Sequence, residues 1–206
     1  MSDGHGPHHP EPLSPAAARA KAIESLLVEK GLISTDAIDA LVQIYEQDIG
    51  PLKGARVVAR AWVDPDFKAR LLADATDAIA EVGIDRSPNQ LVALENTPSV
   101  HNMVVCTLCS CYPSSLLGLP PTWYKSPPYR SRVVREPRAV LREMGCEVAS
   151  DVEVRVWDSS AEVRYLVLPE RPPGTEGLAE DELAALVTRD SMIGVARVRE
   201  PALAGR

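Results

Sequence analysis

Residues 103–111 read Met-Val-Val-Cys-Thr-Leu-Cys-Ser-Cys, an apolar run of strand length that leads directly into three cysteines spaced C-x-x-C-x-C. A similar apolar run covers residues 91–94, and the turn-forming Asn96-Thr97-Pro98 separates the two runs. Short apolar runs bounded by turn residues are typical of buried strands. The sequence therefore predicts two neighbouring strands, the second of which ends at the cysteines.

The distribution of cysteines indicates a metal or redox site. Cys106, Cys109 and Cys111 fall within six residues, whereas Cys146 stands alone. A disulfide framework spreads its cysteines along the chain, and a tight cluster is more typical of metal ligands. We predict that Cys146 is instead a free, half-buried thiol of the core.

Covalent spacing permits a particular metal geometry. A metal bound to the thiolates of Cys109 and Cys111 would also meet the amide nitrogens of Ser110 and Cys111, which closes one six-membered and two five-membered chelate rings. Cys106 could then bind axially and leave one position open for water or substrate. Because an amide nitrogen binds only after it loses a very weakly acidic proton, a 3+ ion such as cobalt(III) or iron(III) is favoured over zinc.

The spacing by itself leaves other kinds of site open. A structural zinc ion could use the three clustered cysteines with His101 or Cys146 as the fourth ligand, and an incomplete iron–sulfur site has similar spacing. A chain that binds no metal is the remaining alternative. His101 has no neighbours in sequence that would form a catalytic triad, so a structural role is favoured for it.

Helical patterns come before the strands, and mixed patterns follow the cysteines. The expected early helices cover residues 14–31, 34–50, 54–62 and 64–83, on the basis of capping residues and apolar periodicity. Residues 129–144 read as a helix that Pro137 interrupts and Gly145 ends. Alternating residues around the turn at 158–160 predict a β-hairpin of 152–157 with 163–167, and a short helix is expected at 181–188.

Together these elements predict an α+β fold. Residues 1–13 read as a disordered tail rich in His and Pro, and residues 14–83 as an N-terminal helical arm, in which the apolar face of the second helix needs a partner. Residues 84–206 are expected to form the globular catalytic domain, a layered α/β arrangement of short strands and helices that holds the metal-binding loop.

Charge and hydropathy exclude several partners. The chain has 206 residues with 22 Lys+Arg against 29 Asp+Glu, a formal charge of −7, and no basic cluster that would bind nucleic acid. No apolar run approaches the roughly 18 residues that span a bilayer, and the first residues lack the pattern of a secretory signal. We expect a cytoplasmic protein that binds neither nucleic acid nor membrane.

The residues around the cysteines resemble the alpha subunit of nitrile hydratase. The likeness covers roughly residues 20–195 and is carried by the cysteine motif at 105–112 and by the segments at 117–126, 129–138 and 189–195. It implies a heteromeric enzyme that hydrates a nitrile to an amide at a non-corrin cobalt or non-haem iron centre. Thr107 and Tyr112, where iron-type members usually have Ser and Thr, make the chain similar to the cobalt type.

The resemblance also implies roles for individual residues. Carried over from the family, Cys106 stays a thiolate, Cys109 becomes a sulfinate and Cys111 a sulfenate, with the amides of Ser110 and Cys111 completing the ligands of one Co(III) per chain, Fe(III) being second choice. The metal would polarise the nitrile, and the sulfenate oxygen of Cys111 would attack its carbon or activate water. Gln90 matches a glutamine that lines the family's pocket, so the candidate catalytic residues are Cys111, Ser110 and Gln90.

Partners follow from the same resemblance. In the family two arginines of a separate beta subunit donate to the oxidised cysteines, which makes a beta subunit the expected partner, and a metallochaperone is expected to load the metal. Residues near the metal loop should serve packing and the interface: Trp123 and Tyr124 through contacts, and four arginines through internal or intersubunit salt bridges, namely Arg130, Arg132, Arg135 and Arg138.

One departure from the family concerns the substrate. Ser114-Ser115 stand where the family usually reads Trp-Pro, which removes a large aromatic side chain next to the site. We expect a wider, more polar pocket for a bulky or heterocyclic nitrile, such as the nucleoside of toyocamycin-type nitrile hydratases. Two alternatives remain: a thiocyanate hydrolase, whose metal subunit has a similar motif, and a non-catalytic protein that stores or transfers metal on unmodified thiols.

Overall fold

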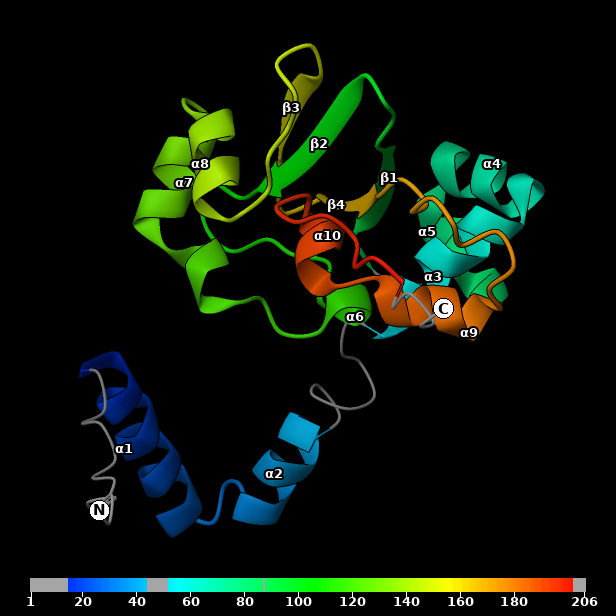
Figure 1. Cartoon of the computed structure of the whole chain (residues 1–206). Helices are drawn as coiled ribbons and strands as arrows, with labels where there is room; N and C mark the ends of the chain where they lie inside the picture. Colours follow the sequence, from blue (N-terminus) through cyan, green and yellow to red (C-terminus); the bar gives the residue numbers. More distant parts are fainter. Residues whose placement is uncertain (1–14, 44–51, 87, 202–206) are drawn as a thin grey trace, which may run out of the picture. The chain divides into compact units, whose positions relative to one another are not determined.

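The computed structural model describes residues 15–43, 52–86 and 88–201, which form a mixture of helices and short strands (Figure 1). The α+β class expected from the sequence is confirmed. The predicted tail at 1–13 and the end of the second predicted helix lie outside the described residues. The elements are α1 (Pro15–Glu29), α2 (Thr35–Gln43), α3 (Leu52–Val63), α4 (Pro65–Ala73), α5 (Ala75–Ala78), η2 (Ile79–Val82), β1 (Gln90–Glu95), β2 (Val100–Val105), α6 (Ser114–Leu117), η3 (Thr122–Lys125), α7 (Pro127–Val133), α8 (Pro137–Glu143), β3 (Glu153–Asp158), β4 (Val163–Leu168), α9 (Glu180–Leu186) and α10 (Arg189–Ile193).

The chain divides into two compact units, Met1–Gln43 and Ile44–Arg206. In the first unit α1 has no buried residue, and its apolar Ile23 and Leu26 are exposed. The expected arm at 14–83 extends across this division, because α3, α4 and α5 pack in the second unit with the strands. That the first helices wrap a partner stays a prediction.

The four strands of the described residues form two parallel pairs. β1 pairs with β4, beginning with Gln90 opposite Val163, and β2 pairs with β3, ending with Val105 opposite Asp158. The predicted hairpin of β3 with β4 is therefore wrong. Alternating side chains fit any half-buried strand, so the pattern located both strands correctly but could not choose their partners.

Hydrogen bonds at the β3–β4 connection explain why no hairpin forms. The backbone N–H of Ser159 donates to the carbonyl of Val105 at 2.7 Å, which keeps the end of β3 on β2. Three residues later the carbonyl of Glu162 accepts from the N–H of Gln90 at 2.8 Å, which starts β4 on β1. The turn thus carries the chain from one strand pair to the other.

The predicted helix at 64–83 is in fact three shorter helices, α4, α5 and η2, so that expectation is corrected, and a cap at Asp74 separates the first two. Asp64 begins α4 by accepting a hydrogen bond from the Phe67 N–H, and Pro65 occupies the first turn. Asp74 then adopts an extended backbone, with φ −151° and ψ 94°, and its side chain caps α5. Because the same residue ends one helix and begins another, the helix axis cannot continue through it.

Helix α3 fixes the position of the segment that follows the cysteines. Its buried residues include Val57, Val58 and Ala59. A Cβ at Gly54 would lie 2.7 Å from Leu117 of α6 and 2.7 Å from Met192 of α10, so glycine is what allows these helices to approach. Figure 1 shows α3, α4, α5 and α9 on one side of the strands and α7 and α8 on the other.

The helices predicted after the cysteines are present in the structure, together with one helix that was not predicted. The helix at 129–144 is interrupted at Pro137 and followed by Gly145 at φ +79°, as predicted. The helix expected at 181–188 is α9, and α10 directly after it was not predicted. Within the described ranges, no helix is both long and apolar enough to cross a membrane.

Candidate metal centre

The three clustered cysteines occupy the loop that begins where β2 ends. Cys106 follows the last strand residue and is 1% exposed, whereas Cys109 is exposed and Cys111 is half-buried. The loop therefore rises from the core to the surface within six residues. One sulfur is anchored in the interior, and the other two face the exterior of the chain.

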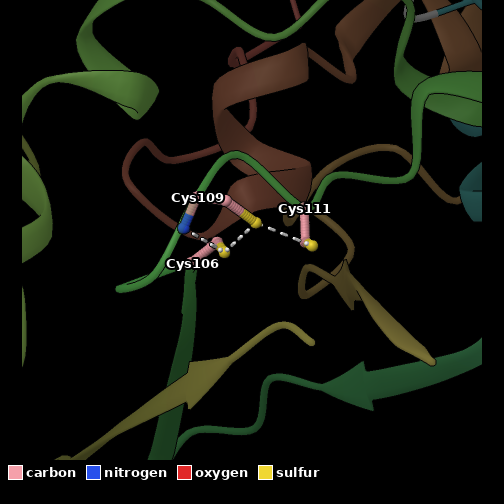
Figure 2. Close-up of side chains that lie close together, drawn as sticks. All are labelled: Cys106, Cys109 and Cys111. Atoms are coloured by element: carbon pink, nitrogen blue, oxygen red, sulfur yellow. Dashed lines mark hydrogen bonds between the residues drawn. The ribbon is translucent and has the colours of Figure 1, made fainter. Parts of the chain in front are cut away.

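The three sulfur atoms point toward one another (Figure 2). The Sγ atoms of Cys106 and Cys109 lie 3.3 Å apart, and those of Cys109 and Cys111 lie 3.1 Å apart. With metal–sulfur bonds of about 2.3 Å, two sulfurs at a right angle around a metal are about 3.3 Å apart, and two at the tetrahedral angle about 3.8 Å. The observed spacing fits the right-angled geometry predicted from the chelate rings better than a tetrahedral zinc site.

The structure gives no support to a fourth ligand from His101 or Cys146. Among the described residues, the group that could hold a metal consists of Cys106, Cys109 and Cys111. The ring of His101 is engaged elsewhere, with Nε2 2.8 Å from the carbonyl oxygen of Gly194. Cys146 is buried, rather than half-buried as expected, and lines a separate cavity of about 320 Å³ beside Arg138 and Arg142.

Contacts among the thiols lower the pKa of Cys109 and raise the pKa of Cys111. Hydrogen bonds from Cys111 and Cys106, with help from the backbone N–H groups of Cys111 and Ser110, lower the pKa of Cys109 to about 7. Burial and the neighbouring Cys109 raise the pKa of Cys111 to about 12. The exposed thiol therefore ionises readily, and its charge opposes ionisation of the next one. A cation that binds both sulfurs would relieve this repulsion.

Two groups from outside the loop, Asp158 and Tyr124, hold the two ends of its backbone. The Asp158 carboxylate at the end of β3 accepts from the Thr107 N–H at 2.9 Å and from the Thr107 hydroxyl at 2.5 Å. The Tyr124 hydroxyl donates to the carbonyl of Cys111 at 2.9 Å. Since burial raises the pKa of Tyr124, this hydroxyl stays protonated and remains a donor.

Aromatic side chains support the loop from beneath. Tyr124 meets Tyr112 edge-on at 5.2 Å between ring centroids, and Trp123 meets Tyr129 edge-on at 4.9 Å. Tyr129 is buried and donates to the carbonyl of Val104 at 2.7 Å. The expectation that Trp123 and Tyr124 pack near the metal loop is confirmed, since both belong to the group of rings beside it.

The four arginines at 130–138 have separate partners. Arg132 forms ion pairs with Glu143 at 2.7 Å and Glu136 at 3.6 Å, which confirms an internal salt bridge. Arg130 and Arg135 instead donate to the carbonyls of Cys109 and Ser131, at 3.2 Å and 3.1 Å. Arg138 donates to three carbonyls of the segment before β3, those of Val148, Ala149 and Val152.

The remaining candidate residues lie around the loop. Ser110 is exposed between the two outer cysteines. Gln90 is exposed at the start of β1, and the next residue pairs with Arg164, whose charge acts on Cys111. A contact of the Gln90 side chain with substrate stays a prediction.

Sequence reasoning did not find the supports of the loop. Asp158 was read as a turn residue, yet in a parallel pair the ends of β2 and β3 meet at one edge, which places its carboxylate beside Thr107. A signal for it exists in the sequence, since an acidic residue directly after an alternating strand often binds nearby backbone N–H groups. The Arg130 contact with Cys109 carries no comparable local signal.

Comparison with known proteins agrees with this geometry. The family model described as nitrile hydratase, alpha chain, matches residues 14–196. The chain is 61% identical over 189 residues to the low-molecular weight cobalt-containing nitrile hydratase subunit alpha of Rhodococcus rhodochrous, with 91% of each chain covered. A solved double mutant of the Fe-type nitrile hydratase from Comamonas testosteroni Ni1 superimposes with a TM-score of 0.83 at 40% identity, covering 94% of this chain and 97% of that one.

A metal-binding enzyme subunit is therefore the class that the fold and the cysteine loop define. This chain belongs to the nitrile hydratase alpha chain family, whose enzymes hydrate nitriles to amides. It is also 45% identical over 187 residues to the thiocyanate hydrolase subunit gamma of Thiobacillus thioparus, covering 85% of this chain and 76% of that one. The family resemblance expected from the sequence is confirmed.

Proposed function

We propose that this chain is the metal-binding subunit of a cobalt-dependent nitrile hydratase. The observation that carries the proposal is the set of three sulfurs 3.1 Å and 3.3 Å apart on a loop open to the exterior. Cys106, Cys109 and Cys111 would hold non-corrin Co(III) together with the amide nitrogens of Ser110 and Cys111. The cobalt-containing relative with 61% identity supports this choice of metal.

Different exposure of the three cysteines supports a different oxidation state for each. Susceptibility to oxidation follows thiolate character and access from solvent. Cys106 is 1% exposed and would remain a thiolate, whereas dioxygen, as the oxidant, would convert the exposed Cys109 to a sulfinate and the half-buried Cys111 to a sulfenate.

In the proposed reaction, the residues of the loop supply the nucleophile and its placement. When bound, a trivalent cobalt ion supplies Lewis acidity toward the nitrile nitrogen. The sulfenate oxygen of Cys111 takes a proton from a water molecule whose oxygen bonds to the nitrile carbon, or it bonds to that carbon itself and is replaced on sulfur by the oxygen of a water molecule. Either way one water adds across the carbon–nitrogen triple bond, with its oxygen on carbon and both of its protons on nitrogen. The Tyr124 hydroxyl on the Cys111 carbonyl fixes the backbone that carries this oxygen, and Gln90 is proposed to line the substrate pocket.

A bulky or heterocyclic nitrile is the proposed substrate class. Ser114 and Ser115 begin α6, three and four residues after Cys111, and both are half-buried. Their small side chains leave room where the expected family pattern has a tryptophan and a proline. Space and hydroxyl groups beside the reacting carbon favour a large, polar substrate.

A beta subunit and a metallochaperone are the proposed partners. The relatives are named as subunits, which indicates assembly with another chain. Negative oxygens on Cys109 and Cys111 need strong donors, and arginines of a beta subunit would provide them. The exposed side chain of Leu108, in the middle of the cysteine motif, agrees with a partner that covers this loop.

Mass spectrometry of the assembled protein tests the proposal. The chain is co-expressed with its beta subunit in cobalt-supplemented cells, and the segment from Cys106 to Cys111 is fragmented after native mass measurement. We expect one cobalt, two added oxygens on Cys109 and one on Cys111. Zinc bound to three unmodified thiolates would contradict the proposal. As matched variants, Cys111→Ser should lose cobalt, whereas Cys146→Ser, outside the group, should retain it.

Thiocyanate hydrolysis is the second candidate, favoured by the 45% identity to a thiocyanate hydrolase subunit. The cobalt-loaded complex is assayed with thiocyanate and with a series of nitriles at equal concentration. Turnover of nitriles alone supports the first proposal. Faster turnover of thiocyanate than of every nitrile would assign the chain to the second function.

A further inference from the structure

Among the residues that the structure describes, Arg130 is the cationic side chain that donates directly to the backbone of the cysteine motif. One terminal nitrogen of its guanidinium lies 3.2 Å from the carbonyl oxygen of Cys109. Arg130 comes from α7, twenty-one residues further along the chain, so this contact is tertiary and not part of the loop's own turn. A side chain from a separate helix therefore sets the electrostatic environment of one particular peptide group.

That peptide group joins Cys109 to Ser110, and its nitrogen is one of the proposed metal ligands. When the Ser110 nitrogen binds a metal, its proton leaves to water, and the nitrogen becomes an anionic amidate. Resonance across the peptide bond places part of the negative charge on the Cys109 carbonyl oxygen. A cationic donor at this oxygen is therefore opposite the charge that metal binding creates, where a charge-assisted hydrogen bond is strongest.

The charge of Arg130 has no carboxylate to neutralise it in the part of the chain that the structure describes. Arg132 on the same helix has two glutamate partners, whereas the Arg130 guanidinium makes its hydrogen bond to a carbonyl. The Nε atom of Arg130 is buried without a hydrogen-bond partner among the described residues. A buried donor left unpaired costs stability, which makes this nitrogen an unusual feature of the helix.

A comparison with Tyr124 shows that the placement is specific. The Tyr124 hydroxyl also donates to a carbonyl of the motif, that of Cys111. The nitrogen of that peptide group belongs to Tyr112, which is not a proposed ligand. The neutral donor thus holds a peptide group that stays uncharged, and the cation holds one of the two that would become charged.

We propose that Arg130 is a positioning residue that polarises the Cys109–Ser110 peptide group and stabilises its amidate form, so that the Ser110 nitrogen can bind the metal. This inference rests on the proposed function, because it assumes that the amide of Ser110 is a ligand. It adds to the metal centre a residue of this chain that touches neither metal nor substrate. Arg130 acts through one carbonyl oxygen.

Three full-length variants separate this role from a structural one. Arg130→Met removes the charge and the donor but keeps a long stem, and Arg130→Lys keeps the charge. Arg135→Met is the matched control, because Arg135 lies just beyond the same helix and donates to the Ser131 carbonyl, away from the loop. We expect about tenfold weaker cobalt uptake for Arg130→Met, from the usual strength of a charged hydrogen bond, partial rescue by Arg130→Lys and no change in the control.

Nuclear magnetic resonance measures the Cys109–Ser110 peptide group directly. Cys109–Ser110 is the only Cys-Ser peptide in the sequence, so carbonyl-¹³C cysteine combined with ¹⁵N serine gives one correlated signal. In the reduced, metal-free chain, Arg130→Met should move the Cys109 carbonyl carbon upfield, and Arg135→Met should leave it in place. On cobalt loading of the unsubstituted chain, the Ser110 N–H signal should disappear while the rest of the spectrum stays folded.

The outcomes distinguish this inference from the proposed function. A Ser110 N–H signal that persists in a cobalt-loaded complex with full hydratase activity would overturn the inference and leave the function intact. An unmoved carbonyl signal and normal cobalt uptake in Arg130→Met would also overturn it. A chain that shows the carbonyl shift and amide loss but no nitrile turnover would support the role of Arg130 and contradict the proposed function.

Discussion

The Asp158 carboxylate accepts two hydrogen bonds from Thr107, one from its backbone N–H at 2.9 Å and one from its hydroxyl at 2.5 Å. The two residues are 51 positions apart, and the parallel pairing of β2 with β3 brings them together. Thr107 directly follows Cys106, so the carboxylate fixes the first turn of the motif. This contact links the strand register to the position of the sulfur atoms.

Removing one of these hydrogen bonds should loosen the metal loop without unfolding the domain. Thr107→Val keeps the shape but lacks the hydroxyl, and we expect a loss of about 1 kcal/mol in unfolding free energy and weaker cobalt binding, because the pair is solvent-exposed. Thr107→Ser retains the hydroxyl and should behave like the unsubstituted chain. Thermal unfolding and metal analysis measure both effects, and equal behaviour of the two variants would argue against the role of this contact.

Pocket size beside the cysteines should depend on Ser114. Ser114→Trp restores a large ring at the start of α6, where the serine is half-buried. We expect kcat/KM for bulky aromatic or heterocyclic nitriles to fall at least about tenfold, with a smaller loss for short aliphatic nitriles, because steric exclusion grows with substrate size. Ser114→Thr serves as the control for the change of hydroxyl environment. Equal losses for large and small nitriles would count against a widened pocket.

Gly194 should be intolerant of any side chain. It has φ +84°, and an added Cβ would lie 2.0 Å from the carbonyl oxygen of Asn102 in β2. We expect Gly194→Ala to destabilise the protein by several kcal/mol, since backbone strain and a clash with a strand combine. Gly83→Ala has the same kind of φ but open space around it, and should cost only about 1 kcal/mol. Denaturant unfolding of both variants checks the difference.

We expect the free energy of unfolding to decrease as the pH is lowered, because His101 is protonated more readily in the unfolded chain. Burial lowers the pKa of His101 below the ordinary 6.5, an effect that its hydrogen bond to Gly194 opposes and that Arg197 and Arg138 reinforce. The unfolded chain therefore takes up a proton below about pH 6.5 that the folded chain does not, and stability present above this pH is lost as the pH falls. Between about pH 7.5 and about pH 5.5 we expect a loss of up to about 1.4 kcal/mol.

The histidine variant isolates this contribution. His101→Gln lowers stability at every pH because it removes a buried ring, but its unfolding free energy should vary less with pH than that of the unsubstituted chain over the same interval. Urea unfolding at the two pH values gives the comparison. The same slope in both proteins would exclude His101 as the titrating group.

The prediction of elements succeeded where the signal was local and failed where partners were distant. Proline and glycine marked the ends of α7 and α8, because their backbone limits act within a few residues. The strands at 153–158 and 163–168 were located, but their pairing was misassigned. Alternation reports which face of a strand is buried and contains no information on which strand lies beside it.

The metal loop shows the same difference between local signals and contacts with distant residues. The sequence by itself predicted the cysteine cluster, because three cysteines within six residues can converge on one point through covalent geometry alone. Only the tertiary structure decided which groups hold that loop: Asp158 on Thr107, Tyr124 on the Cys111 carbonyl and Arg130 on the Cys109 carbonyl. Short spacings follow from bond lengths and chain connectivity, whereas contacts across tens of residues depend on how helices and strands pack, which no local pattern encodes.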